Sequence, residues 1–241
     1  MTYDKTTSMR QLFIKGIRLN RNLVEDFDEY PFNIPIIKNL KEIRFEKRVT
    51  FIMGENGSGK STIIEAIAIS LGLSAEGGTR NMVYETFNST STLDRSFTII
   101  KSGLHPKWKY FLRAETFYTM AKAFSEYDDN NPSIFNQSHG EAFNEIFSRF
   151  SPNGLYLMDE PESALSPKSQ MQLLSKIHSL AKNSQFIIVT HSPLLLSYID
   201  GQILDADNNL KPIAYKDTEN YTIYRRFLEC PEKMQKYLFN D

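Results

Sequence analysis

A glycine-rich run carries the clearest chemical signal in this sequence. It reads Gly54-Glu55-Asn56-Gly57-Ser58-Gly59-Lys60-Ser61, fits the pattern G-x-x-x-x-G-K-[ST], and is followed by Thr62. Glycines let backbone N–H groups turn inward around phosphates, and the N-terminus of a following helix adds partial positive charge. Lys60 would reach the terminal phosphates, and the Ser61 hydroxyl would ligate magnesium. We therefore predict a nucleotide phosphate site over Gly54 to Thr62.

Two adjacent acids, Asp159 and Glu160, supply the groups that nucleotide hydrolysis needs. The apolar run Leu155 to Met158 predicts a buried strand, which would deliver both acids to the carboxyl edge where parallel sheets bind ligands. Because side chains alternate along a strand, the two carboxylates share a site only if the strand stops by about Asp159, as Pro161 favours. We assign Asp159 to magnesium, through water, and Glu160 to the attacking water. The alternative is an exposed acidic turn.

The elements that must position these residues follow an alternating pattern. Short apolar runs, each followed by an amphipathic stretch, predict an α/β fold with a mostly parallel central sheet flanked by helices. The central strands are expected at Val49 to Met53, Leu155 to Met158 and Phe186 to Val189. Ser166-Pro167 and Ser192-Pro193 predict helix starts, because serine caps a helix and proline favours its first position. The turn-rich Asp205 to Leu210 predicts a hairpin, and the chain after it is expected to be helical.

Composition limits the classes of protein that fit. The 241 residues include 28 basic and 29 acidic side chains, for a formal net charge of -1, so no polyanionic partner is indicated. The single cysteine, Cys230, excludes an internal disulfide. The polar N-terminus and the lack of an apolar stretch of roughly 18 residues predict a cytoplasmic protein with no transmembrane segment.

The order of further motifs resembles that of ABC-type ATPase domains, the class shared by transporter motors and by chromosome-maintenance and double-strand-break repair ATPases. Gln137-Ser138-His139-Gly140-Glu141 stands where that family has its L-S-G-G-Q signature, with only Ser138 and Gly140 kept. In the family these two positions contact the γ-phosphate held by the partner subunit, which suits a helix N-terminus. The alternative is a polar cap for a helix over Glu141 to Phe150.

Three more positions are interpreted through the same resemblance. Ser163 to Ser166 resembles the D-loop, although Ser166 stands where many members have aspartate. His191 resembles the switch histidine and could donate a hydrogen bond to the γ-phosphate, or it is a plain histidine at a strand end. Glu115, which ends the apolar run Tyr110 to Ala114, is the candidate for the Q-loop position near magnesium; a solvated or helix-capping glutamate is equally compatible.

The sequence as a whole, including Asn56, the segment Ala75 to Asn81 and the run Phe111 to Glu115, looks like small stand-alone predicted bacterial ATPases of this class, and this likeness covers most of the chain. It implies one ABC-type domain over residues 1–241 with a reduced helical insertion at about 116–150. It also implies binding and hydrolysis of ATP with Mg²⁺, catalysis by Lys60, Glu160 and His191, and an ATP-dependent homodimer.

The resemblance leaves the cellular role open between two readings. One is a dimerisation switch acting in DNA repair or defence with a separate partner protein, and the alternative is the ATP-binding subunit of a membrane transporter. The short interval from Thr116 to Gln137 favours the first, because transporter motors use a larger helical insertion there. Direct nucleic-acid binding would require a basic patch on the surface. Either of two groups could form it: Arg44, Lys47 and Arg48, or Lys101, Lys107 and Lys109.

Two aromatic residues upstream of the phosphate loop, Tyr30 and Phe32, are candidates for stacking on the adenine. Packing in the core is the preferred interpretation of both.

Overall fold

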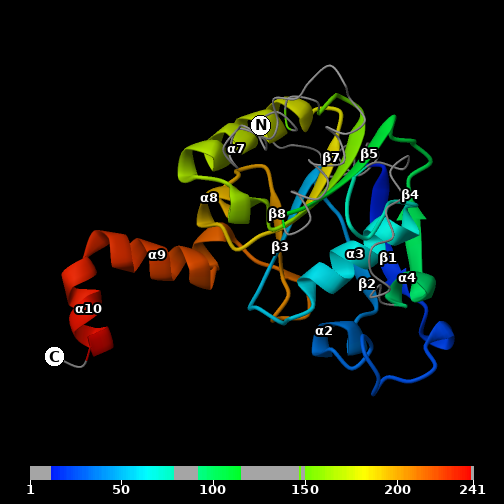
Figure 1. Cartoon of the computed structure of the whole chain (residues 1–241), viewed down its shortest axis with the longest axis horizontal. Coiled ribbons are helices and arrows are strands. Elements are labelled where there is room, and N and C mark those ends of the chain that lie inside the picture. The colour runs from blue at the N-terminus through cyan, green and yellow to red at the C-terminus, as the bar shows by residue number, and fades with distance from the viewer. Residues whose placement is uncertain (1–11, 79–91, 115–146, 148–149, 240–241) are drawn as a thin grey trace.

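The computed structural model describes residues 12–78, 92–114, 147 and 150–239. A six-stranded sheet with the order β5-β6-β7-β3-β8-β9 lies at its centre (Figure 1). Its strands are β3 (Val49–Met53), β5 (Trp108–Arg113), β6 (Gly154–Asp159), β7 (Gln185–Val189), β8 (Gln202–Asp205) and β9 (Lys211–Pro212). The first five of these pair in parallel, and β9 joins β8 antiparallel. The fold is the α/β class with a mostly parallel sheet that the sequence predicts.

The three predicted central strands are confirmed as β3, β6 and β7. Every residue in each of them is buried. These strands are apolar at nearly every position because the strands of a parallel sheet are covered on both faces.

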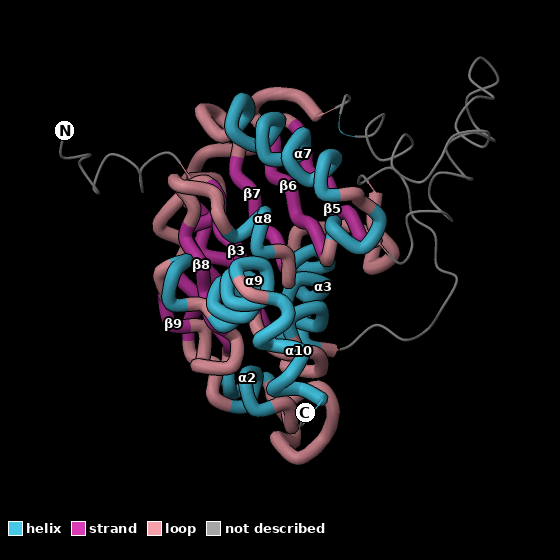
Figure 2. Tube along the Cα trace, turned by 90° about the vertical axis from the view of Figure 1, so that its left-hand side faces the viewer, coloured by secondary structure: helices cyan, strands magenta, loops and turns pink. Residues whose placement is uncertain are grey.

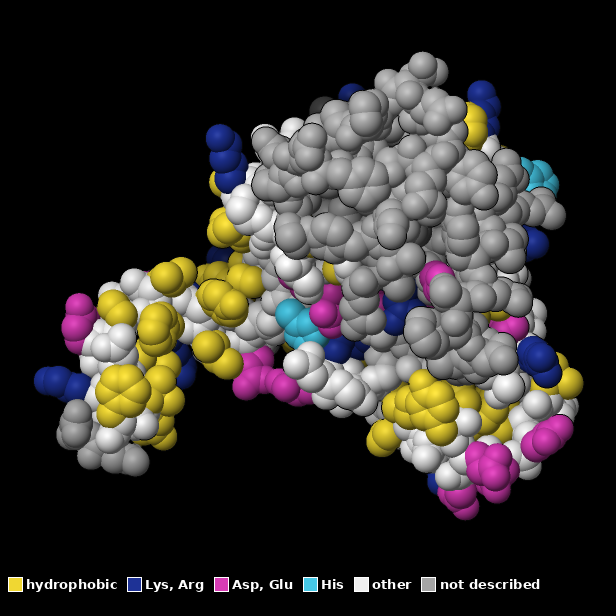
Figure 3. Space-filling model, viewed as in Figure 1, with side chains coloured by type: hydrophobic (Ala, Val, Ile, Leu, Met, Phe, Trp, Pro, Cys, Tyr) yellow, Lys and Arg dark blue, Asp and Glu magenta, His cyan; other side chains and the backbone are white. Residues whose placement is uncertain are grey.

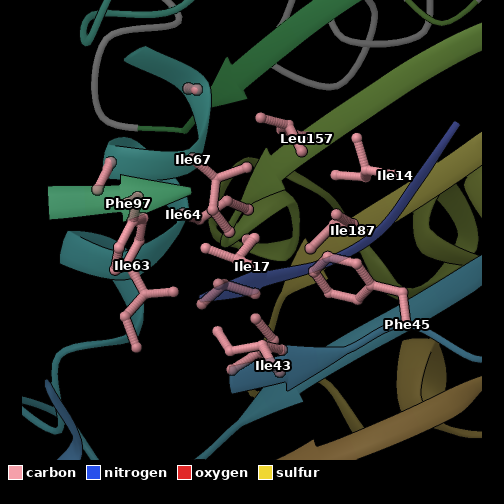
Figure 4. Packing of buried hydrophobic residues seen from close by; sticks show 14 of the residues in the cluster. Ile14, Ile17, Ile43, Phe45, Ile63, Ile64, Ile67, Phe97, Leu157 and Ile187 are labelled. Atoms are coloured by element: carbon pink, nitrogen blue, oxygen red, sulfur yellow. The ribbon is translucent and has the colours of Figure 1, made fainter. Parts of the chain in front are cut away.

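A second, three-stranded antiparallel sheet covers one side of the first. Its order is β2-β1-β4, formed by β1 (Ile14–Leu19), β2 (Glu42–Arg44) and β4 (Phe97–Lys101). The helix α3 (Lys60–Ser70) packs between the two sheets, with Ile63, Ile64 and Ile67 fully buried. Figure 4 shows these isoleucines meeting residues of the small sheet and of β6 and β7. This core fixes the helix that follows the phosphate-binding loop.

Helices α7 (Pro167–Leu180) and α8 (Pro193–Leu196) cover the opposite face of the parallel sheet. Both begin as predicted: Ser166 accepts a hydrogen bond from the backbone of Ser169, and Ser192 accepts one from that of Leu195. The shorter pieces are α2 (Pro35–Lys38), α4 (Leu93–Ser96) and the 3-10 helices η1 (Arg21–Leu23), η3 (Pro161–Ala164) and η4 (Tyr215–Asp217).

The chain after β8 forms the predicted hairpin and then two helices. Leu204 pairs with Pro212 across the turn. Helices α9 (Glu219–Glu229) and α10 (Pro231–Phe239) follow, and they extend away from the sheets in Figure 1. In Figure 2, turned by 90°, the same two helices lie in front of the body. Among the described helices, none has the length and apolar character needed to cross a bilayer.

Most of the expected insertion at 116–150 lies outside the described residues. Phe147 and Phe150 are described, and both are buried. Phe150 stacks on Tyr156 of β6 at 4.3 Å between ring centroids. The part of this segment that the structure describes is therefore anchored on the parallel sheet.

Candidate nucleotide site

The loop between β3 and α3 has a backbone that its glycines permit. Gly54 and Gly59 have φ values of +151° and +96°, a region that L side chains rarely adopt. A Cβ at Gly59 would also lie 2.9 Å from Cγ2 of Ile34. Gly59 directly precedes α3, so the loop leads straight into the helix N-terminus. Asn56 and Gly57 are exposed at the loop's tip, whereas Ser58 and Thr62 are half-buried.

Lys60 is the cation of this loop and is 3 % exposed. Its Nζ donates a 2.6 Å hydrogen bond to the carbonyl oxygen of Glu55 and lies 3.4 Å from Oγ of Ser58. Burial lowers the pKa of Lys60, while the negative charges of Glu160 and Asp207, among other carboxylates, act in the opposite direction. The ammonium group is thus held against the loop that would surround phosphates.

Ser61 and Asp159 meet although 98 positions separate them. The Ser61 hydroxyl donates a 3.1 Å hydrogen bond to Oδ1 of Asp159, which is 6 % exposed. Beside them, Nε of Arg113 lies 3.8 Å from Oδ2 of Asp159, and its Nη1 contacts Glu65 at 2.8 Å. A hydroxyl and a carboxylate are hard oxygen ligands of the type that Mg²⁺ prefers. These two oxygens therefore fit a magnesium ion bound with nucleotide.

Glu160 turns away from the strand that delivers it. Strand β6 ends at Asp159, and Glu160 has the left-handed conformation φ 48°, ψ 51° before Pro161 begins η3. This conformation costs a non-glycine residue roughly 1 kcal/mol. The backbone N–H of Glu160 donates to the carbonyl oxygen of Val189 at 2.9 Å, which holds the turn. The condition for both acids to share one site, a strand that stops at Asp159, is confirmed.

His191 follows β7 and faces Glu160. Its Nε2 lies 3.5 Å from Oε1 of Glu160. That nitrogen is buried and has no hydrogen-bond partner among the described residues. The His191 backbone is held on both sides: its N–H donates to Oε1 of Glu162, and its carbonyl accepts a 2.7 Å bond from Nδ2 of Asn220. A buried ring nitrogen that makes no hydrogen bond to a described residue, beside a carboxylate, fits a site that receives a polar ligand.

Four residues in the site's surroundings were missed by the sequence analysis. Asp207 accepts the Glu55 N–H at 2.8 Å and so anchors the loop from the β8–β9 turn. Arg113 pairs in register with Asp159 across β5 and β6. Glu162 and Asn220 hold His191, and burial raises the pKa of the Glu162 carboxyl. Of these four residues, only Asp207 lies in a segment that the sequence marked, the predicted turn Asp205 to Leu210. The sequence of that turn did not show that it would contact the phosphate loop.

Three assigned residues, Glu115, Ser138 and Gly140, lie outside the described residues. Their roles stay predictions. The chain leading to Glu115 does run beside the site, because the N–H of Ala114 donates to the carbonyl oxygen of Asp159 at 3.2 Å.

The basic and aromatic candidates are largely engaged elsewhere. Arg44 pairs with Glu42 at 2.7 Å, Arg48 lies 3.5 Å from the Ser184 carbonyl, and Lys109 donates to the Leu71 carbonyl at 2.8 Å. Each of the two basic groups therefore contains at least one side chain that is already bonded to another part of the protein. For the aromatic pair, Phe32 is buried in the core, whereas Tyr30 is 65 % exposed. Core packing is correct for Phe32 and wrong for Tyr30, which stands on an exposed turn.

Comparison with known proteins agrees with this geometry. A family model described as AAA domain matches residues 32–190, well over half of the chain. The chain belongs to this AAA domain family. It is 27 % identical over 233 residues to the phosphate import ATP-binding protein PstB of Oceanobacillus iheyensis, an alignment covering 78 % of this chain and 83 % of that protein. The chain is accordingly a nucleotide-binding P-loop ATPase of the ABC type, as the motif order predicts.

Other similarities are narrower or concern the fold alone. A stretch of 80 residues is 32 % identical to a Vibrio cholerae protein named "Retron Vc95 probable ATPase", covering 33 % of this chain and 13 % of that protein. Among solved structures, the SMC head domain from Thermotoga maritima aligns with a TM-score of 0.45 and 17 % identity, covering 80 % of this chain and 95 % of the head domain. A bacterial Atm1-family ABC exporter with ATP bound aligns with a TM-score of 0.42 and 14 % identity, over 89 % of this chain and 42 % of the exporter.

Proposed function

We propose that this protein hydrolyses ATP to ADP and phosphate and uses the cycle to join and separate the nucleotide sites of two copies of itself. One observation supports hydrolysis: Lys60, Glu160 and His191 lie together at the carboxyl edge of one sheet. The hydrogen-bonded pair Ser61 and Asp159 lies beside them. Phosphoryl transfer needs little covalent chemistry from a protein, so positioned charges and donors provide most of the catalysis.

Each side chain has one task in this proposal. Lys60 holds the terminal phosphates, and Glu160 accepts a hydrogen bond from the attacking water and polarises it. His191 presents Nε2–H to the γ-phosphate and stabilises the charge that develops there. Ser61 and Asp159 would hold magnesium, with Glu115 as the third residue assigned to it. When bound with nucleotide, that ion neutralises charge on the β- and γ-phosphates.

The dimer follows from the groups that the sheet edge does not supply. In the family geometry, Ser138 and Gly140 reach the γ-phosphate of the other subunit and not that of their own. ATP would therefore close a two-fold dimer in which each nucleotide lies between the phosphate loop of one copy and residues 138–141 of the other. ADP lacks the γ-phosphate that bridges the subunits, so hydrolysis would open this contact.

The decisive experiment measures assembly in a hydrolysis-blocked background. At a protein concentration too low for any contact that does not need nucleotide, light scattering of Glu160→Gln should report a dimer with ATP and magnesium, and ADP should not produce one. Adding Ser138→Arg should prevent the dimer while calorimetry shows nearly unchanged ATP affinity, because the added bulk lies at the interface and not in the loop. An equally stable dimer from the double variant would remove residues 138–141 from the site and leave a P-loop ATPase without the proposed assembly.

The output of the cycle is proposed to pass to a separate partner protein in DNA repair or defence. The relative named as a retron ATPase supports this direction, and the engaged basic side chains argue for a protein partner over direct contact with nucleic acid. A nuclease-like or toxin-like gene beside this one would support the role.

The second candidate is the ATP-binding subunit of a membrane transporter. It is favoured by the extent of the similarity to the phosphate import protein. Co-purification with a membrane permease encoded beside the gene, together with ATPase activity stimulated by that permease, would establish transport and overturn the proposed switch.

A further inference from the structure

Helices α9 and α10 form an extension that we call the C-terminal arm, residues 219–239 (Figures 1 and 2). The arm is joined to the body at its base, where Thr218 caps α9 and α9 contacts η4 and α8. Beyond that base, neither α9 nor α10 contains a buried residue.

The arm is nevertheless rich in large apolar side chains. On α9 they occupy the spacing i, i+1, i+4 and i+5, which places them on one face of a helix. Hydrophobic side chains cover much of the arm in the view of Figure 3. The exposed residues are Ile223, Tyr224, Phe227, Leu228, Tyr237, Leu238 and Phe239, with exposed fractions from 38 % to 81 %.

Two physical arguments indicate that this surface is covered in solution. Helices shorter than about 12 residues are marginal in water without tertiary packing, and α9 and α10 have 11 and 9 residues. Soluble monomers also rarely expose a contiguous apolar patch of more than a few hundred Å². With aromatic side chains that bury about 150–250 Å² each, the arm offers on the order of 800 Å² per copy, the area of one side of a stable interface.

The charges around this patch distinguish between occupants. The arm carries four basic side chains, Arg225, Arg226, Lys233 and Lys236, and three acidic ones, Glu219, Glu229 and Glu232. A membrane surface or a nucleic acid selects a polar face of predominantly basic charge. A mixed polar border instead complements itself when two identical faces meet around a two-fold axis.

We propose that the C-terminal arm is a homodimerisation surface, on which the arm of a second copy packs without any nucleotide. Four short helices, two from each copy, would then share one apolar core in the manner of a small helix bundle. This contact is separate from the ATP-dependent closure and does not depend on it. It would hold two nucleotide sites near each other at a high effective concentration.

The test uses the full chain without nucleotide, because ATP could join two copies by the other route. We expect light scattering to report a dimer for the wild-type protein at roughly 1 to 100 µM, the weak end for an interface of this area. The double substitution Leu228→Lys, Tyr237→Lys should halve the measured mass. Both side chains are mostly exposed, at 75 % and 81 %, and lysine is a good helix former, so the fold should persist.

A control introduces one lysine at an apolar residue outside the arm. Leu104, in the loop before β5, is 47 % exposed, and Leu104→Lys should leave the dimer intact. ATP affinity equal to that of the wild type would show that the arm variant is folded. A wild-type protein that is monomeric without nucleotide, or an arm variant with the wild-type mass, overturns the proposal and leaves the arm to a different occupant.

Two further variants separate this proposal from the ATP-dependent dimer. Ser138→Arg should remain dimeric without nucleotide, because its arm is unchanged. The arm variant in the Glu160→Gln background should still dimerise with ATP and magnesium, but at a protein concentration at least about tenfold higher, since the tether is lost. A monomeric Ser138→Arg protein without nucleotide would count against dimerisation through the arm. An arm variant that stays monomeric with ATP and magnesium in the Glu160→Gln background would count against closure around ATP.

Cys230 provides an independent measurement. It is the only cysteine in the chain, and it is exposed at the corner between α9 and α10. Since α9 is about 16 Å long, spin labels on the two Cys230 residues of paired arms should lie within about 40 Å of each other. No inter-label signal without nucleotide would contradict arm-to-arm packing.

Discussion

Asn220 Nδ2 donates a 2.7 Å hydrogen bond to the backbone carbonyl oxygen of His191. This bond joins the first turn of α9 to the end of β7, where the His191 side chain faces Glu160. Together with the Glu162 carboxylate on the His191 N–H, it fixes the backbone from which the imidazole projects. The base of the C-terminal arm is thereby in contact with the candidate catalytic histidine.

Asn220→Ala should lower kcat for ATP hydrolysis by about threefold to tenfold, because a misplaced catalytic donor loses a part of its stabilisation of the transition state. ATP affinity should stay within about twofold, since the described hydrogen bond of the Asn220 side chain goes to the His191 backbone and not to the phosphate loop. Steady-state kinetics with calorimetry measures both. Asn183→Ala, an exposed asparagine after α7, is the control and should match the wild type. An equal loss of kcat and of ATP affinity would show general unfolding and not positioning.

Lys60→Ala should weaken ATP binding by at least about a hundredfold, because it removes the cationic side chain that the loop aims at the phosphates. The buried Nζ, bonded to the Glu55 carbonyl, shows that this charge already lies inside the loop. Calorimetry of the folded variant measures the loss. Lys168→Ala, an exposed lysine at the start of α7, should bind ATP normally. Unchanged affinity in Lys60→Ala would remove the phosphate-binding assignment.

Glu160→Gln should retain ATP binding while hydrolysis falls by at least about two orders of magnitude. An amide still hydrogen-bonds water, but it cannot polarise water as a carboxylate does. Phosphate release under saturating ATP gives the rate, and Glu46→Gln, at an exposed glutamate, is the control. Turnover near that of the wild type would move the water-activating role elsewhere, with Glu115 the first candidate.

Magnesium dependence tests the Ser61–Asp159 pair. Asp159→Asn should raise the magnesium concentration needed for half-maximal hydrolysis by about tenfold, because a neutral amide is a weaker ligand for a hard cation. A chelator should abolish hydrolysis in the wild type and leave measurable nucleotide binding through Lys60. If the magnesium requirement of Asp159→Asn equals that of the wild type, the ion is held by other residues.

Local patterns were enough to predict the centre of this fold. Strands β3, β6 and β7 are buried on both faces, so continuous apolar runs revealed them without any knowledge of their neighbours. Lys60 and Ser61 could be identified in the same way, because the loop motif and the helix that follows it are adjacent in the sequence. Asp159 and Glu160 could be placed because Pro161 limits how far β6 can continue.

The antiparallel sheet and the outer contacts of the site could not be derived in that way. In strand β1, Lys15 and Arg18 are exposed and the other four residues are buried, so the strand breaks the strict alternation that would identify a half-buried strand. Its partners β2 and β4 are distant in sequence. Asn220 meets His191 only because α9 returns to the end of β7, and no periodicity in either segment encodes that meeting.

Gln185, fully buried at the start of β7, ties the two sheets together. Its Oε1 accepts hydrogen bonds from the backbone N–H groups of Phe13 and Ile14, at 2.9 and 3.0 Å, and its Nε2 donates to the Ile14 carbonyl at 2.8 Å. Gln185→Leu would leave three buried backbone groups without these bonds, each of which costs roughly 1–3 kcal/mol when unsatisfied. Urea unfolding should therefore show a loss of about 3 kcal/mol in the free energy of unfolding, with an unchanged dependence on urea.

The control for this substitution is Gln172→Leu, at an exposed position on α7, which should change the free energy of unfolding by less than about 0.5 kcal/mol. Because Gln185 is at the amino end of β7 and His191 follows its carboxyl end, the part of the Gln185→Leu population that remains folded should bind ATP as the wild type does. A loss below 0.5 kcal/mol for Gln185→Leu would mean that water or a shifted β1 satisfies the freed groups. In that case Gln185 would not be the residue that fixes the small sheet on the parallel one.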